Sequence, residues 1–167
     1  MNHPLFPVSV LMRRVPLVNR WASEKWEVAE VRPDAGATEI ARYALGDDTW
    51  LWRGFALDLH PSEGEGYYLN MSAPDPRVFV MWRLEEWEDA VTARPWVTTA
   101  SYNEAARMMD AGETVDSVPI PAPIRDWLMP WLEANYQPEV RRKHRRNEAF
   151  WHEGKQAGAT PVKDREE

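Results

Sequence analysis

The run TWLWRGFALDLH, residues 49–60, is the clearest structural signal in the chain. Side chains of a strand point alternately to its two faces, so the run divides into two sets. One set is Leu51, Phe55, Leu57 and Leu59, broken only by Arg53. The other set is Trp50, Trp52, Gly54, Ala56, Asp58 and His60. We expect a strand with one apolar face, and Gly54 inside it predicts a bulge or the close approach of another segment.

Strand patterns continue on both sides of this run. Before it, alternation of apolar and polar residues predicts strands over 5–15, 26–31 and 39–45. After it, the turn-rich HPSEGEG leads to YYLNMSA, and the runs RVFVMWRL and RPWVTTAS are again typical of strands. Turns that contain Pro and Gly separate these runs. They indicate about six antiparallel strands, in a sheet that must curl or pack on another element.

The hydrophobic period changes from that of a strand to that of a helix at residue 101. In SYNEAARMMDAG, Ser101 and Glu104 form a capping box, and Gly112 follows as a C-terminal cap. A second helix is expected after a short extended piece, in PIPAPIRDWLMPWLEANY, starting near Pro121 or Pro123. A proline inside this helix, at position 130, should kink or restart it.

These elements predict an α+β fold, with a curled antiparallel sheet that is barrel-like or sandwich-like, two C-terminal helices and a basic tail. Strands are expected over about 5–100 and helices over about 101–136. The globular domain should span 1–137, and the polar tail 138–167 should be helical or disordered.

The composition excludes several classes of protein. The chain has no Cys, which excludes disulfides, thiolate metal sites and cysteine nucleophiles. Its apolar runs are shorter than the roughly 18 residues of a membrane helix. The paired Arg13 and Arg14 lack the apolar stretch that an export signal needs. We therefore expect a cytoplasmic protein without a membrane span.

The charge is unevenly distributed. The net charge is −7, yet residues 138–167 hold eight Lys or Arg against six Asp or Glu. An acidic body argues against binding to nucleic acid. The basic run of the tail either contacts an acidic partner protein or only improves solubility. Its candidate protein-binding residues are Arg141, Arg142, Lys143, Arg145 and Arg146.

The chain contains ten Trp residues among 167, which is unusual. Most of them are expected in the core, with a surface subset available for a protein interface. The stretch RRVPLVNRWASEKWEVAEV, residues 13–31, places Arg20, Trp21 and Trp26 close together. We interpret them as the corner between the first two strands, with an arginine stacked on an aromatic ring. A partner surface at this corner is the functional alternative.

No motif for catalysis or nucleotide binding stands out. The chain lacks the glycine-rich phosphate loops and the nucleophile elbow. His60, Glu63 and Glu65 share a turn and could bind a divalent metal, but a solvated acidic turn explains them better. Ser101 is better explained as a helix cap than as a nucleophile. We therefore assign no catalytic, cofactor-binding or metal-binding residue.

The order of several blocks resembles an uncharacterised bacterial family. The blocks are the residue 13–31 stretch, ALDLHPSEGEGYYLNMSAPDPRVFVMWR, VTTASYNEAARMMDAGETVDSVPIP and the final helix with its basic tail. The family is a domain-of-unknown-function group, number 3305, encoded beside molybdenum-dependent formate dehydrogenases. This resemblance implies an accessory or maturation role. Some members are labelled as molybdopterin-guanine dinucleotide biosynthesis proteins. The guanylyltransferase that this label describes needs a Gly-rich nucleotide loop near its N-terminus, and residues 1–35 of this chain contain no Gly. The sequence therefore departs from that label.

Three functions are compatible with these observations. The first is a non-catalytic accessory protein that binds a subunit or maturation factor of a formate dehydrogenase. The second is an enzyme of molybdenum cofactor or nucleotide metabolism, and the third is a structural subunit of a larger assembly. The acidic body, the excess of Trp and the basic tail favour the first and third.

Overall fold

The computed structural model describes residues 3–18, 21 and 23–138, and the chain divides into two compact units, Met1–Tyr136 and Gln137–Glu167. The first unit holds the elements described below. In chain order they are β1 (Leu5–Pro16), β2 (Glu24–Pro33), β3 (Ala41–Ala44), β4 (Thr49–Asp58), the 3-10 turn η1 (Pro61–Glu63), α1 (Gly64–Met71), β5 (Arg77–Trp87), β6 (Ala90–Thr99), α2 (Tyr102–Asp110), β7 (Thr114–Pro119) and α3 (Ala122–Asn135).

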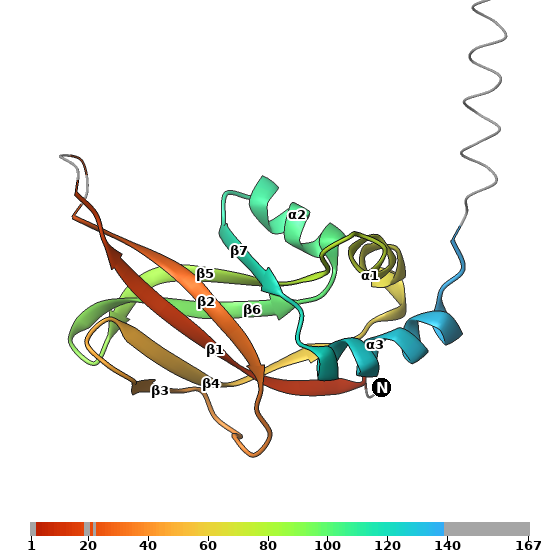
Figure 1. Cartoon of the computed structure of the whole chain (residues 1–167), viewed down its shortest axis with the longest axis horizontal. Coiled ribbons are helices and arrows are strands. Elements are labelled where there is room, and N and C mark those ends of the chain that lie inside the picture. The colour runs from red at the N-terminus through yellow and green to blue at the C-terminus, as the bar shows by residue number, and fades with distance from the viewer. Residues whose placement is uncertain (1–2, 19–20, 22, 139–167) are drawn as a thin grey trace, which may run out of the picture. The chain divides into compact units, whose positions relative to one another are not determined.

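The strands form two antiparallel sheets, with strand orders β2-β1-β4-β3 and β6-β5-β7. The three helices lie at one end of the sheets, and the β1–β2 and β5–β6 connections lie at the other end (Figure 1). This arrangement confirms the α+β class. In place of the single curled sheet that the sequence predicts, the strands form two sheets, and the strand pairing of the described residues closes no barrel.

The apolar core lies between the two sheets. It combines side chains from β1 and β4 with side chains from β5 of the other sheet. The fully buried members include Val8, Val10, Trp52, Val78 and Val80. A second, smaller cluster lies among α1, α3 and the strand ends, and its buried members are Leu59, Tyr67, Ala100, Leu128 and Leu132. The expectation of a Trp-rich core is confirmed in part. Some Trp side chains are buried in the first cluster, and further ones are only partly buried and pack against it.

Side chains bridge the two sheets at two junctions. At the β2–β7 junction, Asp116 Oδ2 accepts hydrogen bonds from the Val28 main-chain N–H (2.9 Å) and from Trp82 Nε1 (3.1 Å). At the β4–β6 junction, Thr98 Oγ1 donates to the Ala56 carbonyl (3.0 Å). β2 is not hydrogen-bonded to β7 as a strand, and β4 is not hydrogen-bonded to β6. The side-chain hydrogen bonds therefore link the two sheets where a closed barrel would have strand pairing.

Gly54 produces the bulge that the sequence predicts. Two residues of β4, Arg53 and Gly54, lie opposite a single residue of β1. Gly54 has a φ of +97°, and a Cβ atom there would lie 2.4 Å from the Glu39 carbonyl oxygen. Both predicted reasons for a glycine, a bulge and a close approach, are confirmed. The bulge also reverses the alternation, so Trp52 is buried while Leu51 is half-buried.

Helix α1 corrects the expectation that helices occur only after residue 100. Its glycines, which the sequence interpretation assigned to a turn, permit close packing of the helix instead. A Cβ atom on Gly66 would lie 2.1 Å from Ser101 Oγ, and one on Gly64 would lie 2.7 Å from Tyr136 Cδ1. The helices are therefore not confined to the C-terminal part of the domain.

The two predicted helices form as α2 and α3. Ser101 Oγ accepts a hydrogen bond from the Glu104 main-chain N–H (3.0 Å), which confirms the N-terminal cap. Gly112 follows the last turn with a φ of +88°, as the cap prediction requires. α3 begins directly after Pro121 and continues through Pro130, so the predicted restart does not occur.

The tail predicted for 138–167 lies outside the described residues except for Pro138. The basic tail is therefore not shown. In the part of the chain that the structure describes, no helix is long and apolar enough to span a membrane.

The segment that follows β2 is held on the bulge by an ion pair. Arg53 Nε and Nη2 donate to Asp34 Oδ2 and Oδ1 (2.8 and 2.7 Å). These hydrogen bonds, more than the charge of Arg53 itself, lower the pKa of Asp34 below its ordinary 3.8. An acid with a lowered pKa stabilises the fold above its unfolded pKa and loses this effect as the pH falls through the folded pKa.

We therefore expect the stability gap between the wild type and Arg53→Gln to be present at neutral pH and to shrink below about pH 4. Urea unfolding of both proteins at pH 7 and pH 3 measures the gap. A gap of equal size at both values would contradict this account of the pair.

Candidate functional site

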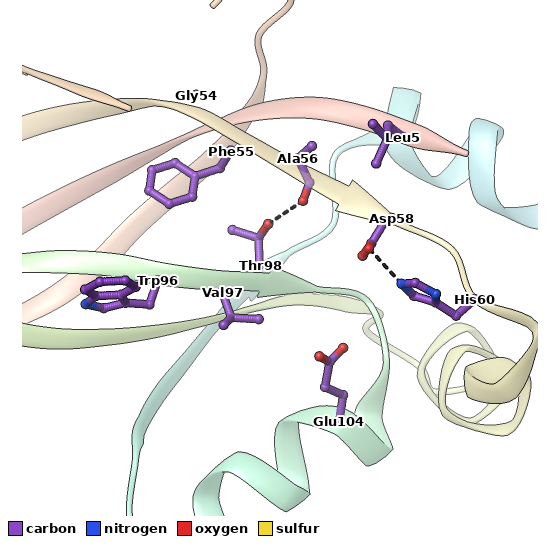
Figure 2. A pocket seen from close by; sticks show the side chains of 10 residues that line it. All are labelled: Leu5, Gly54, Phe55, Ala56, Asp58, His60, Trp96, Val97, Thr98 and Glu104. Atoms are coloured by element: carbon purple, nitrogen blue, oxygen red, sulfur yellow. Dashed lines mark hydrogen bonds and ion pairs between the residues drawn. The ribbon is translucent and has the colours of Figure 1, made fainter. Parts of the chain in front are cut away.

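A groove of about 360 Å³ lies between β4 and β6, close to the start of α2 (Figure 2). Its walls come from these two strands, and Leu5, His60 and Glu104 complete it. The groove lies at the junction where Thr98 bridges to the Ala56 carbonyl. Its two ends differ in chemistry, one being polar and the other apolar.

The polar end is built around the last residues of β4. Asp58 and His60 are two residues apart and lie on one face, and Asp58 Oδ2 is 2.7 Å from His60 Nε2. Tyr67 of α1 fixes this main chain. Its hydroxyl accepts from the His60 N–H (3.1 Å) and donates to the Asp58 carbonyl (3.2 Å). Burial raises the pKa of Tyr67 to about 12, so the hydroxyl stays protonated and keeps donating at neutral pH.

A second carboxylate belongs to this end. Glu104 lies in the first turn of α2 and its side chain points from the helix toward the groove (Figure 2). Among the described residues its carboxylate has no hydrogen-bond or ion-pair partner, and that of Asp58 has His60 alone. The groove lining contains no Lys or Arg. The polar end therefore carries two carboxylates with no Lys or Arg in the lining, and the imidazole of His60 contacts one of them.

The apolar end is formed by Phe55 of β4 and Trp96 of β6, whereas Leu5 of β1 lies beside Asp58, its partner in the β1–β4 pairing, at the other end (Figure 2). Trp96 lies at a register shift in the β5–β6 pairing and is 42% exposed. Its Nε1 donates to Glu85 Oε2 (2.6 Å), and the Arg94 guanidinium lies 3.6 Å from the ring centroid. The indole is therefore both exposed and held in place.

Arg94 supports Trp96 from a buried position. It is 9% exposed, and its Nη1 has no hydrogen-bond partner among the described residues. In addition to its shorter contact with Trp96, this guanidinium lies 6.0 Å from the centroid of the Trp87 ring. Stacking on two indoles stabilises the buried charge.

The hydroxyl groups close to the groove are engaged in holding elements together. Thr98 bridges β6 to β4, and Ser101 caps α2 and donates to Glu63 Oε1 (2.6 Å). The cap interpretation of Ser101 is confirmed. An Asp–His pair can orient an imidazole for proton transfer, but an exposed aromatic ring at one end of a groove with two carboxylates at the other is an arrangement suited to binding.

The metal-site candidates of the sequence do not converge. Glu63 pairs with Ser101 and Arg107, and Glu65 accepts from Asn103 Nδ2 (2.9 Å). The Glu63 side chain is 15% exposed, so the interpretation as a solvated turn is wrong for this residue. In the described part of the chain, no group of three or more His, Asp or Glu could hold a metal ion.

Of the predicted protein-binding residues, the two that the structure describes, Trp21 and Trp26, do not line the groove. Trp21 is 85% exposed on the β1–β2 connection, whereas Trp26 is buried and contacts Trp50 (ring centroids 5.1 Å apart). The arginine on the Trp26 ring is Arg14, at 5.7 Å from its centroid. Arg20 lies outside the described residues. So do the basic residues of the tail, namely Arg141, Arg142, Lys143, Arg145 and Arg146. The binding role assigned to this set stays a prediction.

Sequence reasoning missed the groove as a site. Asp58 and His60 were placed on one face correctly, but Glu104 was interpreted only as part of a cap. Trp96 was interpreted only as one residue of a predicted strand. The one available signal was Pro95 before it, since a proline inside a strand run indicates an edge or a bulge.

The fold and the groove define a small α+β domain of two facing antiparallel sheets, with an open groove at one junction. The model of the family described as "Protein of unknown function (DUF3305)" matches residues 7–145, and the chain belongs to this family. This confirms the resemblance to a family of unknown function. No curated protein and no solved structure matches the chain.

Proposed function

We propose that this protein is a non-catalytic accessory protein that acts by binding another protein through the β4–β6 groove. The observation that carries the proposal is Trp96, an exposed indole fixed by Arg94 and Glu85. Exposed Trp residues are enriched among the few interface residues that supply most of the binding energy. A side chain that is already ordered loses little conformational entropy on binding.

The proposed partner is a subunit or maturation factor of a molybdenum-dependent formate dehydrogenase. This part of the proposal rests on the resemblance of the sequence blocks to a family encoded beside that enzyme. The exposed apolar surface of Leu5 and Trp96 supports protein binding in general and does not distinguish one partner from another.

We expect Trp96→Ala to weaken binding of the purified formate dehydrogenase catalytic subunit about 30-fold, the effect of a hot spot of about 2 kcal/mol. Leu5→Ala should weaken it less, without disturbing Arg94. Biolayer interferometry with the immobilised full chain measures both. Val91→Ala is the matched control, because this residue is 59% exposed but lies next to the β5–β6 turn, outside the groove.

Three results separate the proposal from its alternatives. Unchanged affinity of both groove variants would exclude the groove as the binding surface. Absence of binding to the enzyme subunit and to its maturation factors would remove the assignment of partner. Stoichiometric binding of GTP or a molybdopterin nucleotide, measured by titration calorimetry, would instead favour an enzyme of cofactor metabolism.

A further inference from the structure

We infer that the β4–β6 groove recognises an extended segment of the partner that carries a large apolar side chain and, two to four residues away, a Lys or Arg. This inference rests on the proposed function and specifies the chemistry of the segment that is bound. Its basis is the different chemistry of the two ends of the groove, together with the distance between them.

The polar end selects a cation. Asp58 and Glu104 face it, and the lining of the groove contains no Lys or Arg that neutralises them. Glu104 has no hydrogen-bond or ion-pair partner in the described part of the chain, so its carboxylate is available to a ligand. A basic side chain can pair with Glu104 without displacing a partner and can share Asp58 with His60, whereas an acidic side chain meets like charge.

The opposite end selects an apolar group rather than a second cation. The ring of Trp96 already has a guanidinium, that of Arg94, at 3.6 Å, and Arg83 lies 5.6 Å from the same centroid. Arg94 already covers a face of this ring, and the nearby Glu85 is engaged by the indole Nε1, so this end favours an apolar group over a second cation. Phe55 of β4 is the other residue that lines the groove at this end.

The geometry of β4 sets the spacing. The groove follows this strand from Gly54 to Asp58. Four residue steps of extended chain cover about 13 Å. A bound segment that is itself extended therefore places side chains two to four residues apart at the two ends. Side chains at even spacing also point to the same side of the segment.

The test uses the full chain and fluorescein-labelled eight-residue peptides built on a Gly-Ser background. Each peptide carries one Leu or Trp, and the residue two or four positions before or after it is Arg, Gln or Glu. Fluorescence anisotropy gives the affinities. We expect the Arg peptides to bind about tenfold more tightly than the Gln peptides, since each exposed charge pair contributes up to roughly fivefold. The Glu peptides should be weakest, and the preference should decrease with salt.

The variant Asp58→Asn with Glu104→Gln should abolish the preference for Arg, so that the Arg, Gln and Glu peptides bind with similar affinity. Glu86→Gln with Asp89→Asn is the matched control, because it removes two exposed charges at the β5–β6 end, outside the groove, and should keep the preference. A preference that persists in the groove variant, equal binding of Arg and Glu peptides, or no binding of any peptide would overturn the inference.

The results also separate this inference from the proposed function. If Trp96→Ala weakens capture of the partner protein while the double carboxylate variant does not, the groove binds a protein but does not select a cation. If neither change affects capture of the partner, the groove is not the binding surface and the proposed function fails with it.

Discussion

Gly54→Ala is expected to lower the free energy of unfolding by about 2–6 kcal/mol. Two effects contribute to this range. The residue has a φ of +97°, and a side chain in a rarely populated backbone region costs about 1–3 kcal/mol. The new Cβ atom would also lie 2.4 Å from a main-chain oxygen, that of Glu39, which cannot rotate away as a side chain can. Overpacking of this kind costs about another 1–3 kcal/mol.

Gly36→Ala separates these two effects. Gly36 has a similar φ of +102°, but no atom lies within 4 Å of the position of its Cβ. It should therefore show the backbone cost alone. Urea unfolding of the two variants and the wild type gives the difference. Equal losses would show that contact with Glu39 contributes nothing, and a Gly54 variant as stable as the wild type would contradict the tight packing at the bulge.

The bulge also shows what the sequence of β4 could and could not predict. A glycine in a strand indicated an irregularity, and the structure has one at Gly54. The direction of the side chains beyond it could not be predicted, because an extra residue reverses the alternation and the sequence does not reveal whether a glycine adds one. Trp52 was consequently placed on the wrong face, although the strand itself was correct.

Helix α1 was missed for a different reason. Its sequence carries Gly64 and Gly66, and glycine is unfavourable in a helix by about 1 kcal/mol relative to Ala. Contacts far away in the sequence outweigh this preference. Ser101 and Tyr136 approach so closely that only glycine fits at the two positions. Local sequence shows the cost of these glycines but not the packing that requires them.

The candidate site was predictable only in part because it combines distant elements. The pairing of Asp58 with His60 follows from their spacing on one strand. Their proximity to Trp96 and Glu104 depends on how β6 and α2 lie against β4, which is a property of the tertiary fold. The Trp21 corner and the basic tail were favoured instead because their charges and rings are adjacent in sequence.

Asp116→Ala is expected to destabilise the domain by about 2–4 kcal/mol. One carboxylate oxygen accepts hydrogen bonds from the Val28 N–H of one sheet and from Trp82 Nε1 of the other. Hydrogen bonds to a charged group contribute about 1.5–3 kcal/mol each, and less where the site is partly exposed, as it is here. Alanine would leave both donors without this acceptor.

The position of Val28 explains why its N–H depends on this acceptor. Val28 lies next to the register shift between β1 and β2, at an edge strand that has no ladder partner on its outer side. Its N–H therefore depends on β7, the edge strand of the facing sheet.

Asp116→Asn keeps an oxygen acceptor of the same size and removes the charge, so it should lose about half as much stability as the alanine variant. Thermal and urea unfolding of the three proteins test this order, and an alanine variant as stable as the wild type would mean that Asp116 contributes nothing to holding the two sheets together at the β2–β7 junction.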